Sequence, residues 1–482
     1  MAFLASWPSA TFTAAAPARR APAQLAVAPE SGDFGAVDLA VAQKGEAIAV
    51  WTRHSTLETS TSAAQVLRWT PSTELDEENM FQDTTLTASA AVDARGDVVA
   101  AWERTGGPQV IEVAVRPAHL GRWRAPVAVS AAPEPPMLGG DEAPRVAVGS
   151  NGQAVVVWVR HVLALGAETR VVEAAVGSVR TGRWGRPAVL SAPGVAAEGP
   201  QVAVDAHGGA AAVWEAFEGS QAQHEAGVVQ TATRAATGGA WSAPTTISSN
   251  APGQRDPQIG LDSTGDAVAV WQRADSPTEE APATVEAAFG KVAGARWAHS
   301  RQLSPDGVPA GSPALAVNAR GEAVALWERD EQLRNSIVEV SGSVRQDTFD
   351  APIVLASWNH VAQPMTCLVG GIHIDPHPVR RCRARQLPHA EPQIALNGRG
   401  GSAALWRRAD AFQAVIEAAR RQPARPSWQS LGRISTDSAS EARIGLDAAG
   451  RAVAIWRRLT ECTLSCDPRE TLEASVLADN LP

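Results

Sequence analysis

Residues 201–214 have the sequence QVAVDAHGGAAAVW: an apolar run, a turn that contains Gly208, and a second apolar run that ends in Trp214. Seven other segments repeat this pattern, and each places a Trp six residues after its Gly. Eight copies at one fixed offset indicate a tandem-repeat protein. The glycines are Gly45, Gly96, Gly152, Gly208, Gly265, Gly321, Gly400 and Gly450, and the tryptophans are Trp51, Trp102, Trp158, Trp214, Trp271, Trp327, Trp406 and Trp456.

The chemistry of the turn explains the repeated Gly. Asp205 stands three residues before Gly208, and Asp or Asn at the first position with Gly at the fourth is typical of a type I turn. The Gly then takes the left-handed conformation that closes a tight hairpin with a bulge. Six repeats carry Asp or Asn at this position, whereas Ala42 and Gly149 depart from it. Short flanking runs rich in Val and Ile predict two strands rather than a helix.

A second phrase follows each hairpin. It is an alternating run such as VVQTATRA, then a segment that opens with an aromatic residue and often has Pro three residues later, as in Trp241 and Pro244. Proline cannot donate to a strand ladder, so this last segment belongs at an outer edge. Successive repeat glycines lie 50–57 residues apart, with one spacing of 79. We therefore predict an all-β fold, a single β-propeller of eight four-stranded blades.

The two ends of the chain predict how the ring closes. After Trp456 there is room for a third strand near residues 471–476 but not for a fourth. Residues 7–12, WPSATF, are similar to the fourth-strand phrase WSAPTTIS. We predict that an N-terminal strand within residues 1–13 completes the last blade, that residues 14–35 are a linker, and that residues 36–482 hold the eight repeats. We expect a monomer.

Composition narrows the class of protein. Hydrophobic residues make up 45% of the chain and charged residues 19%, as in globular proteins. The net charge is −9, so we expect no nucleic-acid partner, and no apolar run is long enough to span a membrane. Two local cysteine pairs, Cys367 with Cys382 and Cys462 with Cys466, predict disulfides and an extracellular or cell-surface location. A signal peptide is not evident in the sequence.

The phrase QVAVDAHGGAAAVW resembles the repeats of bacterial β-propellers of the NHL and related types, whose first two strands carry a V-A-V-D-x-x-G turn. It is more distantly similar to the Asp-box repeats of sialidase-type propellers, because the Trp here lies farther beyond the Gly. The resemblance covers almost the whole chain and implies an innermost first strand and an outermost fourth strand. It carries over no functional residue, since such propellers serve as hydrolases, lyases, lectins and scaffolds.

Seven repeat tryptophans are followed two residues later by Arg, with Ala216 as the exception in the fourth repeat. Such a ring is a candidate for binding anionic sugars or carboxylates. A position repeated around a ring more often stabilises the repeats themselves, and we favour that structural role. The tryptophans have the same two interpretations, and for them we favour burial between blades over stacking on sugars.

The spacing of 79 residues marks an insertion at about residues 358–391, between the sixth and seventh repeats. Trp358 fits neither repeated aromatic position, because Phe349 already occupies the outer-strand site. In an extended segment the two histidines and the aspartate of this insertion would project to one side, as metal ligands do. Pro376 and Pro378 interrupt the segment, however, and no fourth ligand is fixed, so we predict no metal and no cofactor. The candidate ligand-binding residues are Trp358, His373, Asp375, His377, Arg380 and Arg381.

We expect this insertion to overhang the same face of the ring as the loops that follow the repeat tryptophans. Binding residues concentrate on loops that a rigid scaffold positions. The alternative is a tolerated surface insertion, because long loops cost little stability.

The sequence holds no G-x-S-x-G, H-E-x-x-H or phosphate-binding loop, and its lack of Tyr removes the usual sialidase nucleophile. It favours an exported, non-catalytic binding or scaffold propeller that recognises a glycan or a protein partner through the loops of one face. The alternative is a glycoside hydrolase or lyase whose carboxylates come from different blades and therefore leave no local motif.

Overall fold

The computed structural model describes residues 22–28, 34–53, 56–62, 68–75, 87–104, 109–131, 141–164, 167–217, 227–249, 253–274, 283–331, 334–359, 366–368, 381–383, 390–409, 414–423, 425, 427–436, 438–460 and 469–477. Every regular element in these ranges is a β-strand. Within them, no helix is long and apolar enough to cross a membrane.

The first four blades each contain four antiparallel strands in chain order. Blade 1 has β2 (Phe34–Val41), β3 (Ala47–Arg53), β4 (Thr56–Ser62) and β5 (Thr73–Glu74). Blade 2 has β6 (Ala88–Val92), β7 (Val98–Arg104), β8 (Val110–Arg116) and β9 (Val127–Ala128). Blade 3 has β10 (Asp141–Val148), β11 (Gln153–Ala164), β12 (Ala167–Ser178) and β13 (Ala188–Val189). Blade 4 has β14 (Ala196–Val204), β15 (Ala210–Phe217), β16 (Val228–Arg234) and β17 (Thr245–Thr246).

Blades 5 and 6 have their outer strand split into two short pieces that pair with the same third strand. Blade 5 has β18 (Gln254–Leu261), β19 (Asp266–Ala274), β20 (Ala283–Lys291), β21 (Arg296–Trp297) and β22 (Arg301–Gln302). Blade 6 has β23 (Ala310–Val317), β24 (Glu322–Glu331), β25 (Arg334–Ser343), β26 (Thr348–Phe349) and β27 (Ile353–Asn359). Blade 7 has β30 (Gln393–Leu396), β31 (Ser402–Ala409), β32 (Ala414–Arg421) and β33 (Gln429–Arg433).

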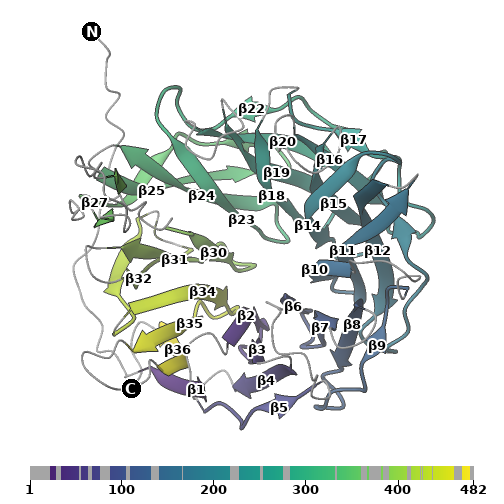
Figure 1. Cartoon of the computed structure of the whole chain (residues 1–482), viewed down its shortest axis with the longest axis horizontal. Helices are drawn as coiled ribbons and strands as arrows, with labels where there is room; N and C mark the ends of the chain where they lie inside the picture. The colour runs from purple at the N-terminus through teal and green to yellow at the C-terminus, as the bar shows by residue number, and fades with distance from the viewer. Residues whose placement is uncertain are drawn as a thin grey trace, which may run out of the picture.

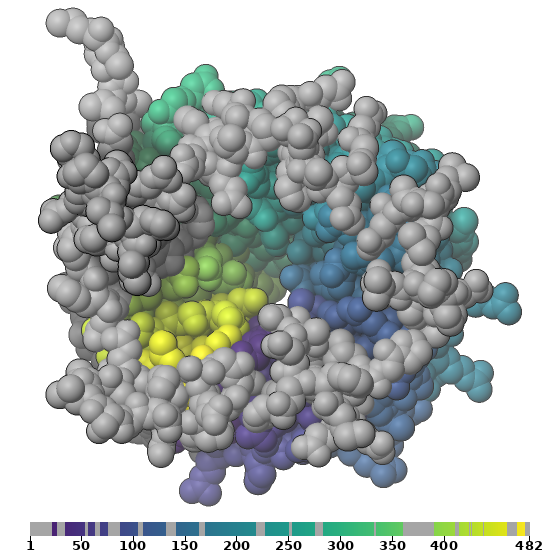
Figure 2. Space-filling view, viewed as in Figure 1, coloured from purple at the N-terminus to yellow at the C-terminus, as the bar shows by residue number. Residues whose placement is uncertain are grey.

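Blade 8 joins the two ends of the chain. It has β34 (Ser438–Leu446), β35 (Ala452–Thr460), β36 (Arg469–Leu477) and, as its outer strand, β1 (Ala23–Ala28). Figure 1 shows the eight sheets around a central axis with the first strand of each blade innermost, and Figure 2 shows purple blade 1 beside yellow blade 8. The predicted all-β propeller of eight blades, closed by an N-terminal strand, is confirmed.

The closing strand lies at a different place from the one predicted. Ala23–Ala28 pairs with β36, within the segment 14–35 that we had assigned to a linker, and Leu25 packs on the core between blades 1 and 8. Alternation in the sequence AQLAVA suits an outer strand with one face on that core. Residues 1–13 lie outside the described residues, and the position of the strand is corrected to Ala23–Ala28.

The hairpin turns have the predicted chemistry. The Asp205 carboxylate accepts hydrogen bonds from the amides of His207 and Gly209, both at 2.8 Å, and Gly208 has a φ of +96°. Turns of successive blades are also joined, because Asn151 Nδ2 donates to the His207 carbonyl at 2.7 Å. One end of the ring is therefore held by side chains that link each turn to the next.

The repeat tryptophans form the core between blades. All eight are at most 2% exposed. Trp158 of blade 3 packs against Val99 and Ile111 of blade 2, and Trp51 of blade 1 packs against Ile455 of blade 8. Each indole thus lies against the preceding blade, as the structural interpretation of the repeat predicted.

The turn geometry predicts unequal costs for two equivalent substitutions. Gly208→Ala and Gly450→Ala both place a side chain at positive φ, at roughly 1–2 kcal/mol each. At Gly208 the added carbon would also lie 2.7 Å from Nδ2 of Asn151 and 2.9 Å from a Gln153 side-chain carbon, whereas nothing lies within 4 Å at Gly450. Urea unfolding should therefore show a larger loss for G208A than for G450A. Unchanged midpoints for both variants would contradict the turn assignment.

The pairing of β1 with β36 predicts which N-terminal truncation matters. Removing residues 1–28 deletes β1 and leaves β36 as a long unpaired edge, which should lower the melting temperature and promote association. Removing residues 1–20 retains β1 and serves as the control, with the melting temperature and the monomer peak of the parent. Equal behaviour of the two truncations in melting and light scattering would show that β1 does not close the ring.

Candidate functional site

The repeated arginines form ion pairs inside their own blades rather than an open ligand surface. Six of the seven bind a Glu of the adjacent third strand, and this Glu can also accept the indole hydrogen bond, as Glu473 does from Trp456 at 3.0 Å. Blade 6 differs, because Arg329 pairs with Glu331. The ion pairs of the other six blades are Arg53–Glu58, Arg104–Glu112, Arg160–Glu173, Arg273–Glu286, Arg408–Glu417 and Arg458–Glu473.

Blade 4 has lost both partners of this pair. Ala216 stands where the Arg is expected, and Gln230 stands opposite Trp214, where six of the other blades have Glu and blade 6 has Val338. Loss of the cation together with the anion is the pattern of a structural ion pair, since either charge left alone would be costly.

Trp358, the first predicted ligand-binding residue, lies in the core. It is only 8% exposed, and packs with Leu326, Trp406 and Trp428 between blades 6 and 7. The split outer strand of blade 6 carries it there, because β27 continues along β25 and pairs Trp358 with Asn335. An indole so enclosed offers no face to a sugar, so its assignment to a ligand site is corrected to a packing role.

The other predicted residues of the insertion are described only in part. Cys367 and Cys382 lie directly opposite each other in the antiparallel pair β28 (Thr366–Leu368) and β29 (Arg381–Arg383), a register that suits the predicted disulfide. Arg381 is described as backbone within β29. The remaining predicted site residues and cysteines, His373, Asp375, His377, Arg380, Cys462 and Cys466, lie outside the described residues.

Polar residues that differ from blade to blade gather instead at one end of the ring. First strands begin there and second strands end there, because the two are antiparallel. We call this end the mouth. It comprises the first residues of each inner strand and the residue after each repeat Trp, including Glu103, Asp141, Glu142, Glu198, Glu215, Asp256, Glu328, Glu391, Arg407, Glu441 and Arg457.

The mouth is held rigid by bulges in the inner strands. Non-glycine residues in these bulges have positive φ, for example +55° at Asp256 and +52° at Ser312. A side chain from the preceding blade accepts the amide hydrogen bond at each, from Asp256 to Glu215 at 2.7 Å and from Ser312 to Gln272 at 3.3 Å. Backbone strain of this kind persists only where the surroundings enforce it, and such strain clusters at functional sites.

Carboxylates dominate the mouth over blades 2 to 5, and we call Glu103, Asp141, Glu142, Glu198, Glu215 and Asp256 the carboxylate arc. Burial raises the pKa of Glu103 to about 7 and that of Asp141 to about 6. Glu142 is compensated by His161 at 3.1 Å, a contact that lowers the Glu142 pKa.

Two carboxylates of the arc are directly opposed. Glu198 of β14 and Glu215 of β15 are ladder partners, a like-charge pairing that destabilises a sheet unless one member is neutral. Arg170 compensates Glu198 at 2.6 Å. Burial, with smaller contributions from Asp256 and Glu198, raises the pKa of Glu215 to about 8. A pKa raised to about 8 favours the protonated form of Glu215 at neutral pH, the form that can act as an acid.

A second polar cluster lies deeper along the axis. Arg443 of blade 8 is 3.8 Å from Asp38 of blade 1, and Asp38 also accepts the Ala90 amide of blade 2 at 2.8 Å. Arg145 of blade 3 lies close enough that Arg443 lowers its pKa and Asp38 raises it, although burial is the main cause of a lowered Arg145 pKa. Two guanidiniums and one carboxylate from three blades thus converge on the inner strands.

Sequence reasoning missed both clusters because neither belongs to the repeat. The signal was present: the residue before each inner-strand apolar run is Asp38, Ser89, Arg145, Gln201, Gln258, Ala314, Gln393 or Arg443, and it differs among blades while its neighbours stay alike. Among the described residues, no group of three His, Cys, Asp or Glu side chains is arranged to hold a metal ion.

No protein-family model and no curated protein sequence matches the chain. Among solved structures it is similar to the BP39L lectin from Burkholderia pseudomallei, at 15% identity over 83% of this chain and 100% of the lectin, with a TM-score of 0.49. It is also similar to a PL25 ulvan lyase, at 9% identity over 84% of this chain and 95% of the lyase, TM-score 0.44, and to the Dos1 propeller, at 8% identity over 94% and 95%, TM-score 0.46. At these identities the likeness concerns the fold alone.

The raised pKa values predict a stability that falls with pH. An unfolded Glu has a pKa near 4.5, so between about pH 4.5 and 8 the native state keeps a proton on Glu215 that the unfolded state has lost. The free energy of unfolding should therefore fall by roughly 1.4 kcal/mol per pH unit for such a group. Glu215→Gln removes this contribution, so its stability relative to the parent should rise from pH 5 to pH 9 in urea titrations. Glu74→Gln, on the exposed outer strand of blade 1, is the control, and parallel curves for parent and E215Q would contradict the assignment.

Proposed function

We propose that this chain is an exported, non-catalytic binding or scaffold propeller that recognises a glycan or a protein partner at the mouth, and we favour a glycan. One observation carries the proposal. Polar residues that recur from blade to blade form ion pairs within the blades. Polar residues that differ among blades lie at the mouth and along the axis. A position that differs among otherwise equivalent blades is free of the constraint of the repeat and available for a ligand.

The chemistry of the mouth suits a polyhydroxylated ligand. Carboxylates are strong acceptors for sugar hydroxyl groups, and a protonated carboxyl such as Glu215 can also donate a hydrogen bond to a sugar oxygen. The arc presents several of them on strands rather than on long loops, which keeps a site preorganised and reduces the entropy lost on binding.

The opposed pair Glu198 and Glu215 favours a second candidate, glycoside hydrolysis with carboxylates from neighbouring strands and blades. Glu215, protonated at neutral pH, would donate its proton to the glycosidic oxygen as the bond from that oxygen to the anomeric carbon breaks. Glu198 or Asp256 would accept a proton from the water that bonds to the same carbon. A lyase would instead use a carboxylate to remove the proton on the carbon beside a uronate carboxyl, as a carbon–carbon double bond forms, the glycosidic carbon–oxygen bond breaks and Glu215 protonates the leaving oxygen.

A glycan array with a parallel turnover assay separates these candidates. The parent should bind one group of glycans, and E215Q should weaken binding at least tenfold while E74Q does not. Binding without new reducing ends or unsaturated sugars supports the binding module. Turnover that E215Q abolishes supports the enzyme instead. Equal binding by parent and E215Q, or no glycan bound at all, would overturn recognition at the mouth.

A further inference from the structure

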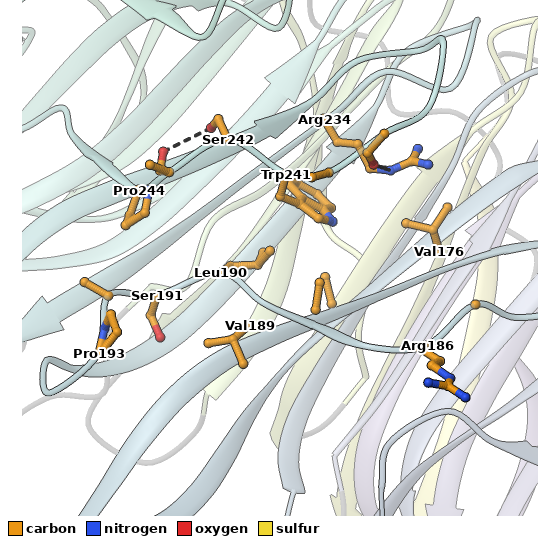
Figure 3. Close-up of a pocket in the computed structure, with 17 residues that line it drawn as sticks. Val176, Arg186, Val189, Leu190, Ser191, Pro193, Arg234, Trp241, Ser242 and Pro244 are labelled. Carbon is orange, nitrogen blue, oxygen red and sulfur yellow. Dashed lines mark hydrogen bonds between the residues drawn. The ribbon is translucent and has the colours of Figure 1, made fainter.

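A groove lies at the outer strands of blades 3 and 4, and its lining includes none of the mouth residues named above. It encloses about 630 Å³. Its blade 3 side is formed by β12, β13 and residues 190–193, and its blade 4 side by Arg234 and residues 239–244. Figure 3 shows Trp241 and Arg234 on one side of this rim groove and Arg186 on the other.

The rim groove carries two cations and no anion. Its lining includes Arg186 and Arg234 but no Asp or Glu. Arg186 is exposed and makes no ion pair with any described residue. Arg234 is held through Nε by the Gly239 carbonyl at 3.1 Å, while its Nη1 is buried without a hydrogen-bond partner among the described residues. The hydrogen bond to Gly239 fixes the Arg234 side chain at the groove, where the exposed guanidinium of Arg186 is available to an anionic ligand.

The charge continues beyond the groove. The outer segments of blades 2, 3 and 4, at residues 117–131, 177–193 and 234–249, contain no Asp or Glu in a chain whose net charge is −9. Their arginines form what we call the rim belt: Arg122, Arg124, Arg180, Arg183, Arg186 and Arg234. Arg124 ties two of these blades together through the Thr181 and Arg180 carbonyls, at 2.8 and 3.1 Å.

Edge protection alone does not explain this arrangement. Positive side chains on outer strands prevent edge-to-edge pairing, and the belt serves that purpose. It does not require two arginines to face one concavity, beside the aromatic residue that opens the outer segment of blade 4. Trp241 packs one part of its ring on the core of blades 3 and 4 and lines the rim groove with the rest.

We infer that the rim groove binds an acidic sugar, a uronate or a sulfated unit of an anionic polysaccharide. Arg186 and Arg234 bind its carboxylate or sulfate, Trp241 lies against the sugar ring, and Ser191 and Ser242 are within the lining for hydroxyl groups. The polymer continues along the exposed arginines of the rim belt, Arg122, Arg124 and Arg183, whereas Arg180 is paired with Asp97 at 3.5 Å. This site is separate from the mouth and stands whether or not the mouth binds a glycan.

A saccharide fits the rim groove better than a nucleic acid or an acidic peptide. Its lining is made largely of small side chains, among them Ala174, Ala188 and Ala192, which leave room for a sugar ring. Trp241 is the only aromatic residue in the lining, whereas single strands of nucleic acid are bound by successive aromatic platforms.

The test is calorimetric titration of the full chain with tetragalacturonate, with maltotetraose as the neutral counterpart. The parent should bind only the acidic sugar, and higher salt should weaken the affinity. Arg186→Glu, an exposed change that does not touch the fold, and the pair R186A/R234A should each lower the affinity at least tenfold. The matched control R296A/R425A removes two exposed rim arginines from blades 5 and 7 and should retain the affinity.

Several results would overturn the inference. Equal losses in R186A/R234A and R296A/R425A would show diffuse charge attraction rather than a site. Equal affinity for maltotetraose would exclude recognition of the acidic group. Tighter binding of oligothymidylate or polyglutamate than of tetragalacturonate would assign the rim groove to nucleic acid or to acidic peptide. Absence of binding to tetragalacturonate and to a sulfated tetrasaccharide alike would remove the acidic sugar altogether.

Discussion

The indole of each second strand, buried against the preceding blade, is the contact on which the ring depends. A Trp buries more surface than any other side chain that could occupy the position, and loss of such a side chain from a core costs roughly 3–5 kcal/mol. Because Trp51 of blade 1 packs on Ile455 of blade 8, the same contact closes the ring as well as building it. The Glu of the third strand and the Arg two residues beyond the Trp complete the unit. In blade 8, Glu473 accepts a hydrogen bond from the Trp456 indole and forms an ion pair with Arg458.

How far sequence reasoning reached follows from this unit. Gly208 and Trp214 recur at one offset in eight copies, so the turn, the two inner strands and the number of blades were all predictable. Trp358 was misplaced because a residue outside the repeat pattern is not thereby outside the core: the outer strand of blade 6 is split, and β27 returns the indole to the interior. The closing strand was misplaced because any short alternating segment near the N-terminus can pair with the exposed edge of β36. Ala23–Ala28 is the segment that does so. Candidate site residues such as Glu215 left no motif, because a pair of carboxylates on neighbouring strands is created by the register and not by sequence spacing.

Blade 4 shows how a repeat protein gains an individual site. Its structural ion pair is gone, with Ala216 and Gln230 in place of Arg and Glu, and the residue between Trp214 and Ala216 is Glu215. In other blades a guanidinium stands one residue beyond this position. Burial at this position raises the pKa of Glu215 to about 8. The same blade supplies Arg234 and Trp241 to the rim groove, so the blade that departs most from the repeat contributes to both candidate sites.

The carboxylate arc and the rim belt have opposite charge. The distance between them keeps each from neutralising the other. The arc gathers carboxylates near the axis, while the rim belt gathers arginines on the outer segments of the same blades. Four strands at about 4.8 Å spacing place roughly 14 Å between the first strand and the fourth. The Debye length at physiological ionic strength is about 8 Å, so exposed charges at the rim are largely screened from those at the mouth. An acidic chain can therefore attract a polyanion at its perimeter without weakening a carboxylate site at its axis, and a ligand bound at one site leaves the charge at the other unchanged.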